Sequence, residues 1–200
     1  IGLQGIDLLD EPDWAVVKRY GLTCPMASGP GGIGNGWNDP GMHDELVQKS
    51  EVQLPKIAAA GLPNMIVFSG NRRGMADAEG LENCAKGLKR IMPLAEQLGV
   101  NVVMELLNSK KDHKDYMCDH TAWGVELVQR VESPRFKLLY DIYHMQIMEG
   151  DVIQTILDNI QHIGHFHTGG VPGRNEIDES QELYYPRICQ AIVETAYEGF

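Results

Sequence analysis

Three residues with metal-binding side chains each end an apolar run of the sequence. Glu105 ends Val-Val-Met-Glu, Asp141 ends Leu-Leu-Tyr-Asp, and His167 ends Ile-Gly-His-Phe-His. One such residue could be an exposed or capping polar group, but three in succession at the ends of strand-like runs are hard to explain in that way. Two carboxylates and an imidazole suit one divalent cation with coordination positions left for a substrate. The sequence therefore predicts a metal site, with Mg²⁺ or Mn²⁺ favoured and Co²⁺ or Zn²⁺ admitted by the imidazole.

Further polar residues follow these predicted ligands at short spacings. His144 lies three residues after the second ligand, and Asn108 lies three after the first. Arg174 stands in a Gly-Val-Pro-Gly-Arg loop, where its planar guanidinium would hold a substrate oxygen or carboxylate, or would simply be solvated. His165 shares a face with His167 because side chains alternate along a strand. The remaining histidines have no informative spacing, and we interpret them as surface or structural residues: His43, His113, His120 and His162.

A repeated helix–glycine–strand junction supplies the elements that would position these residues. Pro55–Gly61 precedes the apolar run Met65–Ser69, and Pro93–Gly99 precedes Val100–Leu107. Glycine just past a helix end readily adopts the left-handed conformation that closes the helix. The runs that follow are short and rich in β-branched residues, which is typical of buried parallel strands.

Six expected strands alternate with helices along the chain. The strands are Gln4–Leu9, Leu22–Ala27, Met65–Ser69, Val100–Leu107, Lys137–Tyr143 and His162–Thr168. The helices lie near residues 12–20, 42–60, 77–98, 119–131, 149–160 and 186–197. This alternation predicts an α/β fold with a parallel sheet, and the strand spacing favours a (β/α)8 TIM barrel in a single domain over residues 1–200. Functional side chains of such barrels stand at the carboxyl ends of strands, where the predicted ligands lie.

Aspartates and prolines in the expected helices predict where these helices begin and where they are interrupted. Asp77 and Asp119 are the residue type that caps helix N-termini, so we expect them as N-caps. Pro55 and Pro93 fall inside two expected helices, where a proline should kink or break the helix.

Composition limits the partners and the compartment. The chain has 17 Lys and Arg against 28 Asp and Glu, and its net charge of −11 disfavours binding to nucleic acid. It contains no run of about eighteen apolar residues, so no membrane span is expected. The four scattered cysteines form no CxxC pair and favour reduced thiols, which indicates the cytoplasm unless a leader precedes Ile1.

Several motifs carry a resemblance to a known family. Glu105-Leu-Leu-Asn108, Asp141–Gly150, Ile163–His167 and Pro172-Gly-Arg174 resemble the xylose-isomerase-like sugar isomerase/epimerase family, and the similarity runs over essentially the whole chain. The resemblance implies an eight-stranded barrel whose metal is held by Glu, Asp, His or Gln, and a second Glu on the last strand. The first three ligands correspond to the residues singled out above.

The resemblance also implies roles for the residues around the metal. In the related ketose 3-epimerases, a His three residues after the Asp ligand and an Arg beyond the His ligand contact the substrate, which would be His144 and Arg174. We expect Asn108 to join them. Those epimerases also have a substrate-contacting Glu six residues after the first ligand, where this chain has Lys111. This difference counts against a free-sugar 3-epimerase.

The expected activity is an aldose–ketose type isomerisation of a small hydroxycarbonyl compound, with hydroxypyruvate and tartronate semialdehyde as the expected pair. Glu105 would act as acid and base as well as metal ligand. The alternatives are a ketose 3-epimerase or other sugar isomerase, a barrel that binds sugar or metal without turnover, and an abasic-site endonuclease. The expected partner is a small-molecule substrate, and assembly into a homo-oligomer is left open.

The length of the chain leads to a further expectation. Barrels of this kind need about 250 residues, so we expect these 200 residues to form an incomplete barrel that lacks its first and last strands. Gly99 stands six residues before Glu105, and Gly199-Phe200 repeats that junction. The family's second glutamate is therefore expected beyond the end of the chain. With three protein ligands, metal binding should be weak and turnover close to nil.

Overall fold

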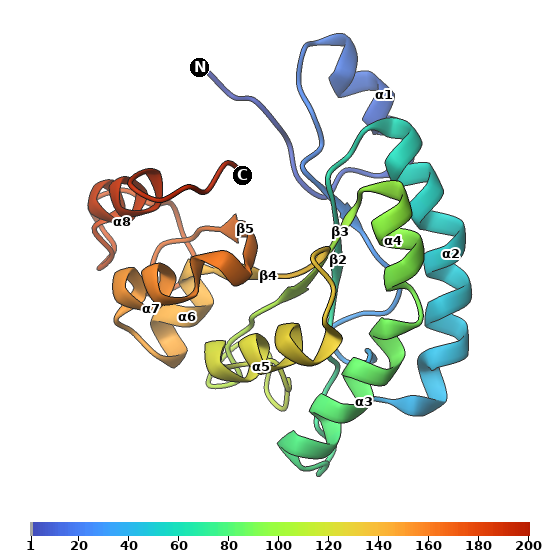
Figure 1. Ribbon diagram of the computed structural model, residues 1–200. Coiled ribbons are helices and arrows are strands. Elements are labelled where there is room, and N and C mark those ends of the chain that lie inside the picture. The colour runs from blue at the N-terminus through green and yellow to red at the C-terminus, as the bar shows by residue number, and fades with distance from the viewer. Residues whose placement is uncertain (1) are drawn as a thin grey trace.

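A curled, five-stranded parallel sheet forms the centre of the molecule. It is seen in a computed structural model that describes residues 2–200. The strands are β1 (Met26–Ser28), β2 (Asn64–Val67), β3 (Asn101–Glu105), β4 (Phe136–Asp141) and β5 (Ile163–His167). They pair in that order, each parallel to the next, and β1 and β5 stand at the two edges of the sheet. The sheet is therefore an open part of a barrel, which confirms the predicted fold (Figure 1).

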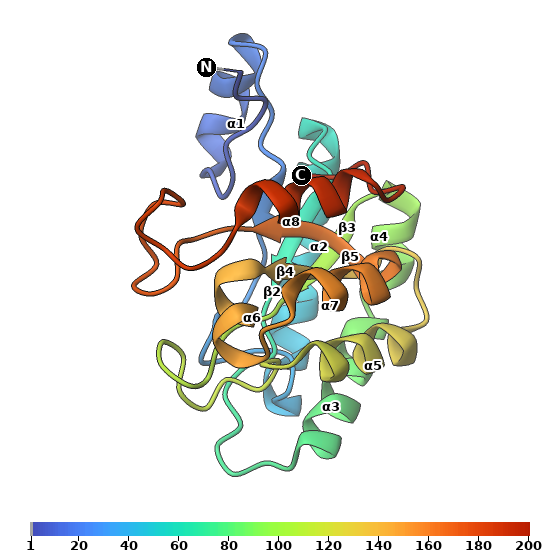
Figure 2. The ribbon, with the colours of Figure 1, turned by 90° about the vertical axis from the view of Figure 1, so that its left-hand side faces the viewer.

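Helices surround the outside of this curled sheet (Figures 1 and 2). The α-helices are α1 (Glu11–Arg19), α2 (His43–Ala60), α3 (Asp77–Lys89), α4 (Met92–Leu98), α5 (Thr121–Val131), α6 (Ile142–Met148), α7 (Val152–Asn159) and α8 (Tyr185–Val193). Two short 3-10 helices, η1 (Pro40–Met42) and η2 (Ile160–His162), precede α2 and β5.

The strand count of the described residues is five, where the sequence predicted about six. Gln4–Leu9 is not a regular strand, although it runs beside the chain that enters β1. Gly5 forms an isolated parallel bridge with Thr23, and the backbone N–H of Leu8 donates to the carbonyl of Met26 at 2.9 Å. Leu8 has φ 57°, in the left-handed region, so the extended conformation ends there.

The two helical prolines behave differently. Pro93 stands in the first turn of α4, after a break that separates α4 from α3, as predicted. Pro55 lies inside α2, which continues unbroken, so the sequence-based expectation of a break is wrong there. Leu54 and Ile57 are fully buried on either side of Pro55, and this packing stabilises α2 despite the missing N–H donor.

Each of the two predicted N-caps lies one residue away from the observed cap position. Asp77 is the first residue of α3 and Ala76 occupies the cap position. His120 occupies the cap position of α5, and Asp119 instead forms an ion pair of 2.9 Å with Arg72. Asp119 therefore pairs with an arginine 47 residues away along the chain and does not cap α5.

The register of the sheet places the predicted ligands side by side at the carboxyl ends of neighbouring strands. Asp141 pairs with His167 across β4 and β5, and Glu105 pairs with Leu139 across β3 and β4. Val103 and Leu139 belong to a small apolar cluster that is separate from the core shared with the helices, which places them on the inner face of the sheet. Since side chains two residues apart share a face, Glu105 and Asp141 stand on the inner face just beyond that cluster. The larger core lies between the sheet and the helices.

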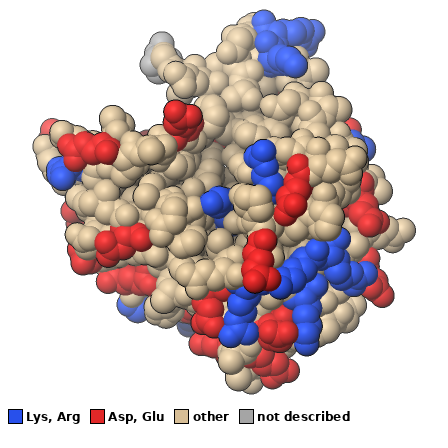
Figure 3. Space-filling view, viewed as in Figure 1, with Lys and Arg blue, Asp and Glu red and all other residues tan. Residues whose placement is uncertain are grey.

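The surface carries mixed charge. In Figure 3, basic side chains toward α3 gather beside acidic ones, and several form exposed ion pairs, such as Arg130 with Glu82 and Lys89 with Glu132. Among the described residues, no helix has the length and apolar character needed to cross a membrane. All four cysteines are free, and Cys189 is the exposed one.

Candidate metal and substrate site

The three predicted ligands converge at the carboxyl ends of β3, β4 and β5. One ligand atom from each of Glu105, Asp141 and His167 lies within 4.8 Å of the other two. Nδ1 of His167 is 3.2 Å from Oε1 of Glu105. Glu105 and Asp141 are buried, whereas the His167 side chain keeps 18% of its surface exposed. The two carboxylates are therefore enclosed by protein, whereas part of the imidazole remains exposed.

Burial and neighbouring groups shift the pKa values of two of these residues. Burial raises the pKa of Asp141 to about 6, and the nearby Glu105 carboxylate adds to that effect. Burial alone would lower the pKa of His167, but hydrogen bonds to Asp7 and Glu105 outweigh it and raise that pKa to about 9. Two buried carboxylates with oxygen atoms close to an imidazole fit a divalent cation, which would neutralise both acids at once.

Asn108 fixes the imidazole of His144 beside the predicted ligands. The Oδ1 atom of Asn108 accepts hydrogen bonds from the backbone N–H groups of Lys111 and Asp112, both at 3.0 Å. This sets the orientation of the amide, so its nitrogen faces Nδ1 of His144 at 2.6 Å and the carboxylate of Asp112 at 2.7 Å. Nδ1 of His144 therefore accepts, and the ring proton stands on Nε2.

Nε2 of His144 is directed at the site. It lies 3.7 Å from Oδ2 of Asp141 and is buried without a hydrogen-bond partner among the residues that the structure describes. Burial and the positive charge of Arg174 lower the pKa of His144 to about 3, so the ring is neutral at neutral pH. A neutral imidazole with a free N–H is suited to donate to an oxygen atom of a bound ligand.

Arg174 approaches the same oxygen atom of Asp141. Its Nη2 atom is 3.4 Å from Oδ2 of Asp141, and its guanidinium lies over the ring of Tyr143, 5.4 Å from the ring centre. Nearly half of the side chain is exposed (48%). Stacking on Tyr143 orients the guanidinium without covering its donors, so those donors stay accessible to an anionic ligand.

Sequence reasoning missed three residues near this site. His113, interpreted as a surface or structural residue, is half-buried and its ring centre is 5.2 Å from that of His144. Asp112 accepts a hydrogen bond of 2.8 Å from the Tyr143 hydroxyl as well as the one from Asn108. These residues lie in an irregular loop after β3, where no periodicity marks them.

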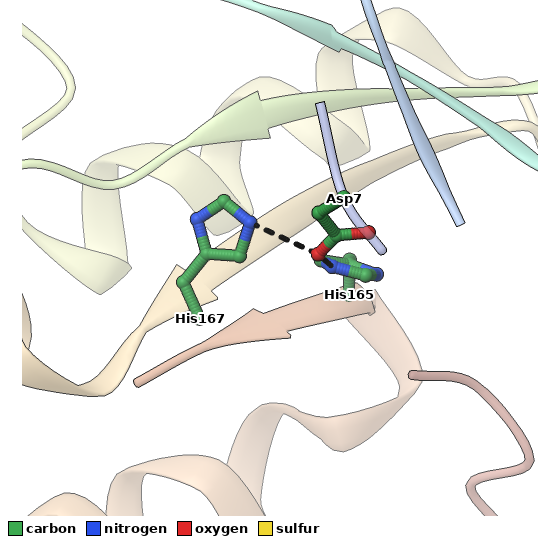
Figure 4. Close-up of side chains that lie close together, drawn as sticks. All are labelled: Asp7, His165 and His167. Carbon is green, nitrogen blue, oxygen red and sulfur yellow. Dashed lines mark hydrogen bonds and ion pairs between the residues drawn. The ribbon is translucent and has the colours of Figure 1, made fainter. Parts of the chain in front are cut away.

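Asp7 is the third missed residue, and it comes from the other end of the chain. Its Oδ2 atom is 2.8 Å from Nε2 of His165 and 3.5 Å from Nε2 of His167 (Figure 4). Burial opposes ionisation of Asp7, but hydrogen bonds with the two histidines hold the pKa of its carboxyl below the usual value. Since 158 residues separate Asp7 from His165, no local pattern could have paired them.

All six predicted site residues therefore lie around one edge of the sheet. Glu105, Asp141 and His167 meet directly, and His144 and Arg174 both approach Asp141. Asn108 is fully buried and is engaged by Lys111, Asp112 and His144. The roles assigned to these residues stay predictions.

Comparison with known proteins gives consistent matches. A family model described as "Xylose isomerase-like TIM barrel" matches residues 14–200. The human protein named "Putative hydroxypyruvate isomerase" is 31% identical over 166 residues, which cover 80% of this chain and 60% of that protein. The 2-oxo-tetronate isomerase of Cupriavidus necator is 34% identical over 102 residues, which cover 51% of this chain and 38% of that protein. The chain thus spans 60% or less of the length of these two relatives.

A solved structure is also similar over almost the whole chain. It is the crystal structure of "AP endonuclease, family 2" from Brucella melitensis, with a TM-score of 0.89 and 25% sequence identity. The similarity covers 98% of this chain and 80% of the solved one.

Proposed function

Because the chain belongs to the xylose isomerase-like TIM barrel family, we propose that it isomerises a small hydroxycarbonyl compound, with hydroxypyruvate and tartronate semialdehyde as the expected pair. The observation that carries the proposal is the convergence of Glu105, Asp141 and His167 within 4.8 Å at the carboxyl edge of the sheet. Relatives named as isomerases of hydroxypyruvate and of 2-oxo-tetronate support the reaction class.

The donor set of the site fits a single hard divalent cation. In this proposal Glu105, Asp141 and His167 hold Mg²⁺ or Mn²⁺, and Co²⁺ or Zn²⁺ would also be accepted by the imidazole. When bound, the cation would supply Lewis-acid stabilisation of the negative charge that develops on the substrate oxygens.

Glu105 is the proposed acid and base. Its carboxylate removes a proton from the carbon that bears the hydroxyl group, and a proton is then returned to the neighbouring carbonyl carbon. For hydroxypyruvate, the C3–H bond breaks and a C2–H bond forms, while the hydroxyl proton passes from the C3 oxygen to the C2 oxygen. The product is tartronate semialdehyde, with no change in atoms or oxidation state overall.

His144 and Arg174 would orient the substrate. The free Nε2–H of His144 donates to a substrate oxygen, because Asn108 holds the ring in that tautomer. The exposed guanidinium of Arg174 would bind the carboxylate of a hydroxy-oxo acid through its planar fork. In this scheme Asn108 acts through His144, although the sequence predicted that it contacts the substrate itself.

Two alternative activities make different demands on the site. A ketose 3-epimerase would need a substrate-contacting residue where this chain has Lys111, and that side chain is exposed. An endonuclease is suggested by the name of the Brucella structure, but Asn175–Glu179 contains no Asp-x-His pair for further metal ligation and the net charge is −11.

Solvent exchange requires only the removal of a proton from carbon, so it distinguishes these activities even where complete turnover is close to nil, as the sequence predicts. The chain is incubated with Mn²⁺ in deuterated water with hydroxypyruvate, with a panel of ketoses and with abasic-site DNA. Deuterium at C3 of hydroxypyruvate, above the rate without protein, is the expected result. Exchange confined to ketoses would favour the epimerase, and strand cleavage would favour the endonuclease. A chain that binds Mn²⁺ yet exchanges nothing would favour the barrel without turnover.

A further inference from the structure

Asp7 lies between two histidines on the inner face of β5. Figure 4 shows its carboxylate directed at the rings of His165 and His167. One oxygen atom, Oδ2, is within 2.8 Å of Nε2 of His165 and 3.5 Å of Nε2 of His167. The His165 side chain is almost completely buried, so its interaction with Asp7 is shielded from solvent.

The two ring nitrogens of His167 face different carboxylates. Nδ1 faces Glu105, whereas Nε2 faces Asp7. An imidazole that binds a metal must release the proton from the binding nitrogen and keep the proton on the other one. Carboxylates that accept a hydrogen bond from that second nitrogen fix the tautomer and the ring orientation of metal-binding histidines.

We propose that Asp7 is a positioning residue of the metal site, which accepts a hydrogen bond from Nε2–H of His167 and so directs Nδ1 toward Glu105 and Asp141. The inference rests on the proposed function, since it requires His167 to be a metal ligand. His165 has the supporting role of holding the Asp7 carboxylate in place through its own Nε2–H.

The backbone around Asp7 supports this role. The N–H of Ile6 donates to the carbonyl of Thr23, and the N–H of Leu8 donates to the carbonyl of Met26, both at 2.9 Å. Asp7 is therefore anchored on both sides to the segment that enters β1. Its side chain contacts His165 on β5, the strand at the opposite edge of the sheet from β1. Asp7 therefore links the two outer strands of the sheet, close to the proposed ligands.

The same three residues could instead hold a cation of their own. One ligand atom from each of Asp7, His165 and His167 lies within 4.8 Å of the other two, and the nitrogen of His167 that faces Asp7 is Nε2. That arrangement would require Nε2 of His167 to be the metal-bound nitrogen, which is the opposite of the proposed tautomer. The nitrogen that binds the ion therefore decides between the two arrangements.

The first measurement needs no variant. The chain labelled with ¹⁵N-histidine is studied by NMR with saturating Mg²⁺, and the His167 signals are assigned with His167→Gln. The proposal expects a protonated Nε2 and an Nδ1 resonance that shifts on addition of Mg²⁺. A proton on Nδ1 and a shift of Nε2 would overturn it.

The second measurement compares Mn²⁺ dissociation constants, obtained from the EPR signal of free Mn²⁺. Asp7→Asn should weaken binding by about 10- to 100-fold, whereas Asp10→Asn, an exposed carboxylate on the same segment, should stay within about twofold of wild type. An Asp7→Asn constant within twofold of wild type would overturn the role of Asp7, even when Asp141→Ala abolishes binding. A wild-type chain that binds no Mn²⁺ would instead overturn the proposed function, and the role of Asp7 with it.

Discussion

The side-chain amide of Asn108 lies 2.6 Å from Nδ1 of His144 and thereby determines which nitrogen of that imidazole carries the proton. Both residues are fully buried, so water cannot substitute for either partner. On the other side of the ring, Nε2 has no hydrogen-bond partner within residues 2–200 and lies beside Asp141. In the proposed function, Asn108 thus controls the tautomer of the substrate-orienting His144 without contacting the substrate itself.

This relationship predicts the effect of Asn108→Asp. A carboxylate cannot donate to Nδ1 of His144, so it should draw the ring proton to Nδ1 and leave Nε2 as an acceptor. The rate of deuterium exchange into hydroxypyruvate should fall by about 10²-fold, as expected when one hydrogen bond to developing charge is lost. The control is Asn159→Asp, whose amide donates to a backbone carbonyl in α7. An unchanged exchange rate, together with an unchanged His144 tautomer by ¹⁵N NMR, would contradict the prediction.

The assignment of acid–base chemistry to Glu105 predicts a loss of exchange in Glu105→Gln. The amide keeps the shape of the side chain but cannot take up a proton, so exchange should fall by at least about 10²-fold. The rate is measured at Mn²⁺ concentrations that saturate the variant, because the substitution also removes a charged ligand. Exchange within twofold of wild type with Mn²⁺ bound would show that another group removes the proton.

Metal binding should strengthen as the pH rises from 6 to 9. The pKa of His167 is raised to about 9 and that of Asp141 to about 6, and both groups must be deprotonated to bind a cation. At pH 7 the imidazole of His167 in the metal-free chain carries a proton on both nitrogens. Metal binding should therefore release about one proton, and the affinity should rise by up to about tenfold per pH unit. Calorimetry at pH 7 in two buffers of different ionisation enthalpy measures the released protons. Binding that releases none would contradict the paired state of His167.

The ion pair between the buried Asp119 and the partly buried Arg72 predicts a specific sensitivity to acid. Burial opposes ionisation of Asp119, but hydrogen bonds from Arg72, Ser109 and His120 hold its pKa below the usual 3.8. A lowered native pKa contributes stability that is present above about pH 4 and is lost as the pH falls through the native value. Asp119→Asn should therefore lower the free energy of unfolding at pH 7 by about 3 kcal/mol and flatten its dependence on pH below 4.

An exposed pair provides the matched control. Glu45 and Lys49 on α2 form an ion pair with side chains more than half exposed. Glu45→Gln should change the free energy of unfolding by less than about 0.5 kcal/mol. Urea titrations between pH 2 and pH 7 compare the free energy of unfolding of both variants with that of wild type. An equal decrease in the two variants would show that the burial of Asp119 does not strengthen its ion pair.

The sequence predicted those parts of the fold and site that depend on local patterns. Apolar runs that end in Glu105, Asp141 and His167 indicated both the strands and the ligands, because alternation along a strand decides which side chains reach the inner face. Prediction from the sequence failed where contacts with distant residues determined the structure. Asp119 pairs with Arg72 instead of capping α5. Helix α2 continues through Pro55 because the residues around that proline are buried.

The boundary between β4 and α6 shows the same limit. The sequence predicted a strand to Tyr143, but Asp141 ends β4 and α6 begins at Ile142. The Asp141 side chain accepts a hydrogen bond of 3.0 Å from the backbone N–H of His144, in the first turn of α6. One residue therefore serves as strand end, helix cap and proposed ligand. Asp7 and His113 carry no local signal at all, and only the folded chain brings them to the site.

The most direct test of the account is the Mn²⁺ stoichiometry of the wild-type chain and of Asp141→Ala, measured by equilibrium dialysis. Asp141 is fully buried between the other two proposed ligands and the donors of His144 and Arg174. The account predicts one Mn²⁺ per wild-type chain and a loss of this binding in the variant, with exchange into hydroxypyruvate lost in parallel. Undiminished stoichiometry in Asp141→Ala would contradict the proposed ligand set.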